Sequence, residues 1–283
     1  MSQGGLSERV GFLRARIAAI EARGGASLPA ARAPATGDFL DTLFDAGALG
    51  EVFPARPPDA PAAAAFALAM ALRARVARGG GAVVFIVEDL SAREFGLPYG
   101  RGLAGAGLDL SRFALMRARR PQETLWAMEE ALKSPACAAV VAETFVAPRL
   151  YDLSASRRLL LAARRGGGLG LLAPQGTEAA RFSSAAELRV EVAAAPPARP
   201  HAEEPAKQAS RSARPPLAPS APFRWRLRVL KARAGLFGEI DPSQWRDIVF
   251  DPDKAAFRHA FPERFPAEAA DRPAVAPLVR RRA

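Results

Sequence analysis

The feature that most constrains this chain is a series of short, largely apolar runs separated by segments with helical patterning. The runs are AVVFIV, RFALMRA, ACAAVVAE, GGLGLLAP and AELRVEVAA, in this order between residues 82 and 194. Helical segments at 61–78, 121–132 and 154–165 alternate with them. Continuous apolar strands are buried on both faces, and they alternate with helices in parallel sheets. The sequence therefore predicts an α/β domain over residues 38–195, with a mainly parallel central sheet flanked by helices.

Net charge and cysteine content indicate which partners and which cellular compartment to expect. The 283 residues include 40 Lys and Arg against 29 Asp and Glu, so the formal net charge is +11. A basic balance favours polyanionic partners such as nucleic acid. The single cysteine, Cys137, excludes an internal disulfide and fits a reducing compartment. No apolar run approaches the ~20 residues of a membrane span, and no signal peptide opens the chain. We therefore expect a cytoplasmic protein without membrane contact.

Residues 1–26 are expected to form an N-terminal amphipathic helix. Five apolar residues recur in it at alternating spacings of four and three: Leu6, Val10, Leu13, Ile17 and Ile20. This spacing makes a seam of about two heptads. Two interpretations stay open. The seam either packs on its own domain, or it binds a partner protein or a second copy of the chain.

The C-terminal third begins with a proline-rich segment at 196–222, which holds eight prolines and is expected to be a disordered linker. A β segment at 223–261, one strand and a hairpin, is expected to pack on the core. A disordered basic tail is expected at 262–283. The strand alternates apolar and basic residues. We interpret its basic side as a stripe that follows nucleic-acid phosphates, formed by Arg224, Arg226, Arg228, Lys231 and Arg233. The alternative is the ordinary solvated face of an edge strand.

An apolar run, a loop and a helix at 51–78 follow the order in which nucleotide-binding α/β proteins build a phosphate site. The loop, Pro54–Pro61, contains four prolines but neither glycine nor lysine. Each proline lacks the N–H donor that a phosphate requires, and no lysine supplies a positive charge. Arg56 is the one cation in the loop. We therefore expect neither ordinary ATP binding nor a cofactor.

Other catalytic chemistry lacks the necessary residues. The two histidines, His201 and His259, and the single cysteine provide neither a Ser-His-Asp site nor zinc-ligand spacing. The segment Gly100–Gly105 matches G-x-G-x-x-G, but a polar loop at 91–99 separates it from the preceding strand. It is therefore expected to be a plain loop. We expect no catalytic and no metal-binding residues.

Acidic residues follow two of the apolar runs. Glu88 and Asp89 end the first run, and Glu143 ends the third. In nucleotide hydrolases, carboxylates at such strand ends polarise water and hold magnesium. Because the loop offers no phosphate cradle, we interpret these acids as structural remnants or as caps of the following helices.

Several long segments resemble the core of the RecA recombinase. They are GAVVFIVED, GLDLSRFALMRARRPQETLWAMEEAL, ACAAVVAE and LGLLAPQ. In this resemblance Glu143 falls at the Walker B acid, and Gln175 falls at the glutamine that senses the γ-phosphate. Arg56, Glu88 and Asp89 complete a degenerate nucleotide site, because the Walker A motif is lost. Because this motif is lost, the resemblance does not imply ATP hydrolysis or ATP-driven filament growth.

The chain resembles the ImuA family of bacterial mutagenesis operons more closely than it resembles RecA; the ImuA proteins are RecA relatives with this same loss. Further segments carry this likeness, namely YDLSASRRLLLAARRGGGLGLLAP and RWRLRVLKARAG. The resemblance implies a non-catalytic, damage-inducible adaptor in error-prone translesion synthesis, nucleoid-associated after damage. Its implied partners are an ImuB-type inactive Y-family protein and, indirectly, an error-prone C-family polymerase, with contact to RecA or DNA. Two alternatives remain: a SulA-like inhibitor of the division protein FtsZ, and a residual RecA-like ATPase.

Overall fold

The computed structural model describes residues 8–9, 11–17, 19, 47–176, 183–195, 223–232, 241 and 243–259. Several expectations lie outside the described residues. They concern the seam residues Leu6, Val10 and Ile20, the stripe residue Arg233, the linker at 196–222 and the tail at 262–283.

The architecture is one sheet with helices on its faces. The strands are β1 (Leu49–Pro54), β2 (Ala82–Glu88), β3 (Phe113–Ala118), β4 (Cys137–Thr144), β5 (Leu169–Pro174), β6 (Leu188–Ala194), β7 (Phe223–Ala232), β8 (Trp245–Asp251) and β9 (Ala256–His259). The helices are α2 (Ala60–Ala77), α3 (Asp89–Phe95), α4 (Gly100–Gly105), α5 (Pro121–Leu132) and α6 (Leu153–Gly166), with short 3-10 helices η2 (Pro57–Asp59) and η3 (Leu110–Arg112).

In the described part of the chain the sheet has nine strands in the order β3-β2-β4-β5-β1-β6-β7-β8-β9. The pairs from β3 to β6 are parallel, and the pairs from β6 to β9 are antiparallel. The predicted α/β class with a mainly parallel central sheet is confirmed. The parallel part follows from strands such as β2 and β4, whose every residue is buried.

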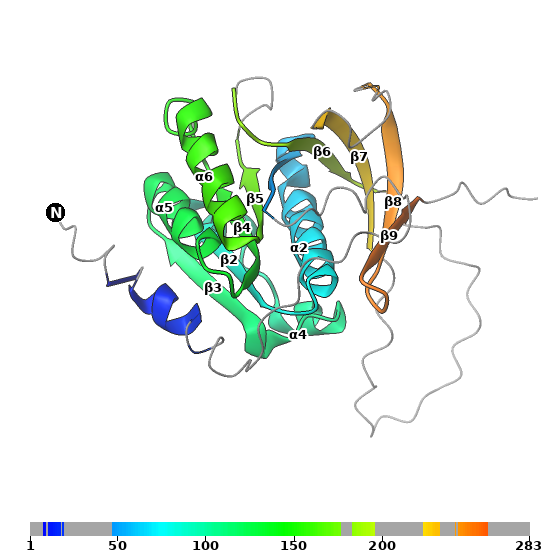
Figure 1. Ribbon diagram of the computed structural model, residues 1–283. Helices are drawn as coiled ribbons and strands as arrows, with labels where there is room; N and C mark the ends of the chain where they lie inside the picture. Colours follow the sequence, from blue (N-terminus) through cyan, green and yellow to red (C-terminus); the bar gives the residue numbers. More distant parts are fainter. Residues whose placement is uncertain are drawn as a thin grey trace, which may run out of the picture.

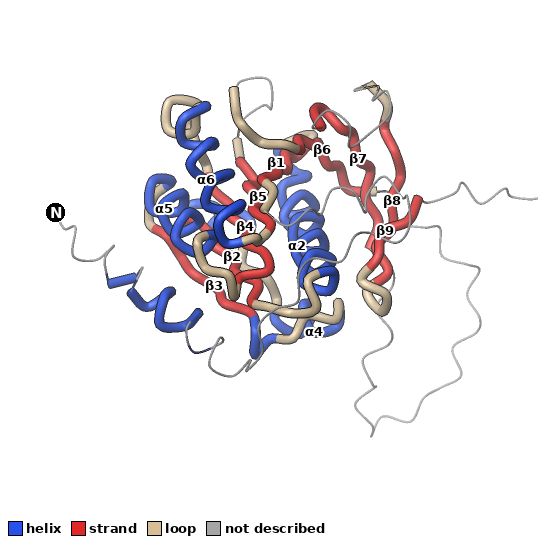
Figure 2. The backbone as a smooth tube through the Cα atoms, in the orientation of Figure 1, coloured by secondary structure: helices blue, strands red, loops and turns tan. Residues whose placement is uncertain are grey.

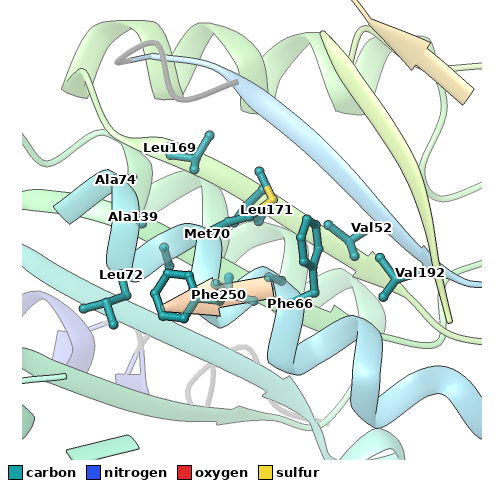
Figure 3. Close-up of a cluster of buried hydrophobic side chains, with 14 of the residues drawn as sticks. Val52, Phe66, Met70, Leu72, Ala74, Ala139, Leu169, Leu171, Val192 and Phe250 are labelled. Atoms are coloured by element: carbon teal, nitrogen blue, oxygen red, sulfur yellow. The ribbon is translucent and has the colours of Figure 1, made fainter. Parts of the chain in front are cut away.

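Helices cover the two faces of the parallel part. Helix α2 lies on one face, and α5 and α6 lie on the other (Figures 1 and 2). Successive strand residues point to opposite faces. Phe85 of β2 therefore belongs to the core packed on α2, whereas its neighbour Ile86 belongs to the core packed on α5 and α6. We call these two clusters the α2-side core and the α5-side core; Figure 3 shows part of the former.

The C-terminal strands join the α2-side core. Strands β7, β8 and β9 lie beside α2 (Figure 1), and Phe66 of α2 packs against two of their aromatic side chains. The ring centroid of Phe66 is 5.5 Å from that of Trp225 and 5.5 Å from that of Phe257. The last three strands therefore extend the same sheet and share its core.

The segment Pro57–Ala77, which comprises η2 and α2, is long and apolar enough to cross a membrane by length and composition alone. The expectation that no apolar segment approaches this length was therefore wrong. In the structure 56% of its most apolar 18-residue stretch is buried inside the fold. Phe66 and Met70 are fully buried in the α2-side core (Figure 3), so α2 packs as a core helix of the sheet.

The N-terminal helical segment, described over residues 8–9, 11–17 and 19, packs on the chain's own fold. Leu13 and Ile17 are buried in the α5-side core. Arg14 forms an ion pair with Glu130 of α5. The structure thus favours the first of the two interpretations for Leu13 and Ile17. In this arrangement neither side chain is available to a partner protein.

The segment between β2 and β3 is more helical than expected. The predicted loop at Gly100–Gly105 is wrong, because these residues form α4. The polar loop expected at 91–99 is partly helical as well, since α3 covers Asp89–Phe95. Both helices are short, and α3 ends at Gly96, whose φ of +82° favours glycine.

Candidate functional site

The loop after β1 uses its polar groups within the protein. Asp59, which is 2% exposed, accepts hydrogen bonds from Arg56 Nε at 3.1 Å and from the backbone N–H of Ala194 at 3.1 Å. The hydrogen bond from Arg56 to Asp59 raises the pKa of the guanidinium. The N–H of Ala55 donates to Val192 O at 2.9 Å, and the N–H of Asp59 donates to Arg56 O at 2.8 Å. The one cation and these two donors therefore do not point together at a phosphate.

The sheet brings most of the predicted nucleotide-site residues to one edge. The strands β2, β4, β5 and β1 are consecutive neighbours and parallel, so their carboxyl ends meet at the same side of the sheet. Each of these strands has one predicted site residue at or just beyond its carboxyl end: Glu88 for β2, Glu143 for β4, Gln175 for β5 and Arg56 for β1. This is the edge at which α/β proteins bind ligands.

The acids at this edge nevertheless face opposite sides of the sheet. Glu88 continues the alternation of Ile86 into the α5-side core, whereas Glu143 continues that of Val141 into the α2-side core. Glu88 accepts hydrogen bonds from Thr144 Oγ1 and from the N–H of Phe145, both at 2.7 Å. It therefore ties the end of β2 to the end of β4.

Neither Glu88 nor Asp89 serves as a helix cap through its side chain. Glu88 occupies the N-cap position of α3 but makes no side-chain capping bond. Asp89 forms an ion pair with Arg117 of β3 at 2.9 Å. Both carboxylates thus have structural partners on neighbouring strands, which supports the interpretation as structural residues.

Glu143 is different, because its carboxyl group is buried without compensation. It is 4% exposed, and within the described part of the chain its Oε1 has no hydrogen-bond partner. Burial raises the pKa of Glu143 to about 7, since the charged form loses its hydration. Gln175 is also buried: its Nε2 donates to Ala173 O at 3.5 Å, and its Oε1 has no partner among the described residues. Among the described residues near this edge, Glu143 and Gln175 thus keep an unsatisfied side-chain oxygen, as does Ser91 of α3 through its Oγ.

Sequence reasoning missed a buried polar network on the other face. Glu51 of β1 is 0% exposed and accepts hydrogen bonds from Tyr151 Oη at 2.7 Å and Arg189 Nε at 2.6 Å. Desolvation and the neighbouring Glu51 raise the pKa of Tyr151. The signal was present in the sequence as a lone acid inside the apolar run LGEVFP. Its partner is Arg189, the residue directly opposite on β6, and this pairing appears only once the strands are aligned.

The described members of the basic stripe lie on β7, and they differ in exposure and in their partners. Arg224 and Arg226 are exposed, whereas Arg228 is half-buried. Arg226 pairs with Asp247 at 3.4 Å, and Arg228 pairs with Glu191. The Nζ of Lys231 donates to Ser184 O at 3.2 Å. Arg224 has no ion-pair partner among the residues that the structure describes.

The strand that carries the stripe is not an edge strand. It pairs with β6 on one side and with β8 on the other, so the expected alternative of a solvated edge does not apply. Trp225, on the opposite face, is 3% exposed and belongs to the α2-side core. The stripe is thus a partly neutralised face of an interior strand.

Comparison with known proteins gives sequence relatives for part of the chain. No protein-family model matches. Two curated proteins, each named Protein ImuA, match from Caulobacter vibrioides strains NA1000 / CB15N and ATCC 19089 / CIP 103742 / CB 15. Each is 42% identical over 101 residues, which is 36% of this chain and 37% of the relative. The match therefore spans little more than a third of the curated relatives.

Two solved structures are similar at a lower level. The RadB recombinase has a TM-score of 0.45 at 17% identity, over 76% of this chain and 94% of that one. SulA from Pseudomonas aeruginosa has a TM-score of 0.35 at 20% identity, over 45% of this chain and 98% of that one. The sequence match, rather than either of these, confirms the resemblance that the motifs indicate: over the matched residues, this chain is a relative of the ImuA proteins.

Proposed function

We propose that the chain is a non-catalytic adaptor in damage-induced, error-prone DNA synthesis, acting in the cytoplasm at the nucleoid. The likeness to the ImuA proteins supports this role. Its partners would be an ImuB-type inactive Y-family protein and, through it, an error-prone C-family polymerase. Contacts with RecA and with DNA complete the proposal.

The loop after β1 is the single observation that carries the non-catalytic part. A phosphate cradle needs backbone N–H groups and a cation that are free to face the ligand. Here prolines remove donors, and Asp59 holds the guanidinium of Arg56. Glu88 and Asp89, which would assist hydrolysis, are bound to protein groups instead. A fold of this kind can still bind proteins, because binding uses its surface rather than this loop.

Exposed apolar side chains on the helices of the α5 side support a protein partner. Trp126 of α5 is 55% exposed, and Leu161 of α6 is 57% exposed. Exposed tryptophan is among the residues that contribute most to protein interfaces. We infer that the helical face formed by α5 and α6 binds the Y-family partner.

Co-purification tests the adaptor role. The tagged chain is expected to retain a co-expressed ImuB-type protein, and Trp126→Ala is expected to lower the retained amount by about tenfold or more. Leu90→Ala is the matched control, since Leu90 is 45% exposed on α3, away from this face. Loss of the gene should also lower the damage-induced mutation frequency. If Trp126→Ala retains as much ImuB-type protein as the natural chain, the interface lies on another surface. If the natural chain retains none, the adaptor role is contradicted.

Calorimetry with ATP and magnesium tests the non-catalytic part separately. We expect no heat of binding at micromolar protein concentration. Micromolar binding that Glu143→Ala abolishes would overturn this part and favour a residual ATPase.

A further inference from the structure

A cavity opens beside α2, between this helix, the segment 95–108 and the strands β2, β4, β7 and β8. It has a volume of about 280 Å³. Apolar residues of α2, including Ala64, Ala65 and Leu68, line it. For comparison, a protein cavity of about 150 Å³ accommodates benzene. The space is therefore sufficient for a molecule of roughly two rings.

Six aromatic side chains contribute to the apolar walls of this cavity. The aromatic side chains that line it are Phe85, Phe95, Tyr99, Phe223, Trp225 and Phe250. They come from β2, from α3, from the segment between α3 and α4, and from β7 and β8. Phe223 and Trp225 stack with ring centroids 6.0 Å apart and planes at 18°. Tyr99 is 69% exposed and therefore lies at the mouth.

One carboxyl side chain faces this apolar space. Among the described residues that line the cavity, Glu143 is the only one with an ionisable acid or base besides Tyr99. Its Oε1 has no hydrogen-bond partner in the described structure, and no Lys, Arg or His lines the cavity beside it. A buried carboxyl group without a partner costs free energy, which a bound donor would recover.

We propose that this cavity binds a small organic cation: an apolar molecule of one or two rings whose ammonium group pairs with Glu143. Aromatic faces attract cations through their quadrupole, and proteins use aromatic cages to bind organic ammonium groups. Ligand pockets add a few placed polar groups to apolar walls, and here Glu143 is such a group. The apolar part of the ligand would lie against Leu68 and Trp225. The inference concerns a surface separate from α5 and α6, and it does not depend on the adaptor role.

The lining disfavours other classes of small molecule. A phosphate or carboxylate ligand would meet Glu143 as a like charge, without a cation to compensate. A neutral hydrocarbon would fill the space but would leave the carboxyl group of Glu143 unpaired. An ammonium group can make cation–π contacts with the aromatic side chains and an ion pair with the carboxylate of Glu143.

The test uses tryptamine, a two-ring ammonium, and 3-propylindole, a neutral molecule of nearly the same shape. Calorimetry with the full-length protein is expected to show tryptamine binding at least about tenfold more tightly. Glu143→Gln should weaken tryptamine by about tenfold or more and leave 3-propylindole within about twofold. Glu94→Gln is the matched control, because Glu94 is exposed on α3 and does not line the cavity.

A second variant keeps the inference falsifiable if the carboxyl group matters only for folding. Ala65→Phe places a ring in the cavity and should abolish binding of both indoles while leaving the circular dichroism spectrum unchanged. Several results would overturn the proposal: no tryptamine binding at millimolar concentration, equal affinity for the two indoles, or tryptamine binding that survives either Glu143→Gln or Ala65→Phe.

Discussion

At the scale of single residues, Glu143 makes stability depend on pH. Burial raises its pKa from 4.5 to about 7 in the folded chain. Between these values the folded chain holds a proton that the unfolded chain has released, so stability falls as pH rises. Below about pH 4.5 both states are protonated and the penalty vanishes. Above about pH 7 the penalty is constant at about 3 kcal/mol.

Glu143→Gln should therefore remove a pH-dependent loss of stability. Urea denaturation at pH 5 and pH 8 measures it: between these values the natural chain should lose about 2 to 3 kcal/mol relative to the variant. Other titrating groups act on both proteins alike, so the difference isolates Glu143. Parallel pH profiles for the two proteins would show that the carboxyl group has an ordinary pKa.

The same residue shows where sequence reasoning ends. The apolar runs place Glu88 and Glu143 correctly at the ends of neighbouring strands, because strand ends follow from composition. Which face each side chain takes depends on the parity of its position in the strand. From the sequence alone we could not determine which face each acid occupies. We therefore grouped Glu88 and Glu143 in one site, although they lie on opposite faces of the sheet. The pairing of Glu51 with Arg189 required the register of β1 and β6 in the same way.

At the scale of elements, the N-terminal helix is expected to stabilise its own fold. Leu13 is 2% exposed in the α5-side core, whereas its neighbour Phe12 is 67% exposed. Leu13→Asp would bury a charge and should lower the free energy of unfolding by about 3 kcal/mol. Phe12→Asp, the control on the outer face, should change it by less than about 0.5 kcal/mol. If Leu13→Asp leaves the thermal unfolding temperature unchanged, the interpretation of the seam as a docking surface for a partner would be favoured instead.

Strand β7 offers fewer free cations to DNA than its sequence suggests. Alternation places successive arginines about 7 Å apart on one face, but Glu191 holds Arg228. If single-stranded DNA binds here, Arg224 and Arg226 are the exposed arginines that can contact it. Lys231 is exposed as well, but its Nζ donates to Ser184 O. Changing both to Ser should flatten the log–log salt dependence of binding by about 1.4, and Arg228→Ser should change it little. Arg93→Ser on α3 is the control. A slope unaffected by the double change would place DNA binding, if any, on other basic residues.

At the scale of the whole molecule, the parallel strands and the longer helices α2, α5 and α6 were predictable. The C-terminal β segment was expected to pack on the core, but the sequence did not predict that it pairs with β6 and extends the sheet. Local patterns predict α5 at 121–132 as observed, because Pro121 can open a helix and apolar residues recur along it. Whether β7 to β9 would stand apart or extend the sheet depends on pairing between β6 and β7, which the intervening segment at 196–222 does not encode. The cavity beside α2 arises from the same assembly, since Phe223, Trp225 and Phe250 line it.

Because the C-terminal strands share the α2-side core, we expect the described fold to unfold as one cooperative unit. Phe66 packs against both Trp225 and Phe257, so separating β7 to β9 would expose the core of the parallel sheet. The chain has three tryptophans, which allow one probe at each end of the molecule. Replacing Trp225 and Trp245 with Phe leaves Trp126 of α5 as the probe; replacing Trp126 and Trp245 leaves Trp225 of β7. In each variant the urea midpoint by fluorescence should coincide with the midpoint by circular dichroism. A fluorescence transition for Trp225 that precedes the circular dichroism transition would instead make the last three strands a separately unfolding unit.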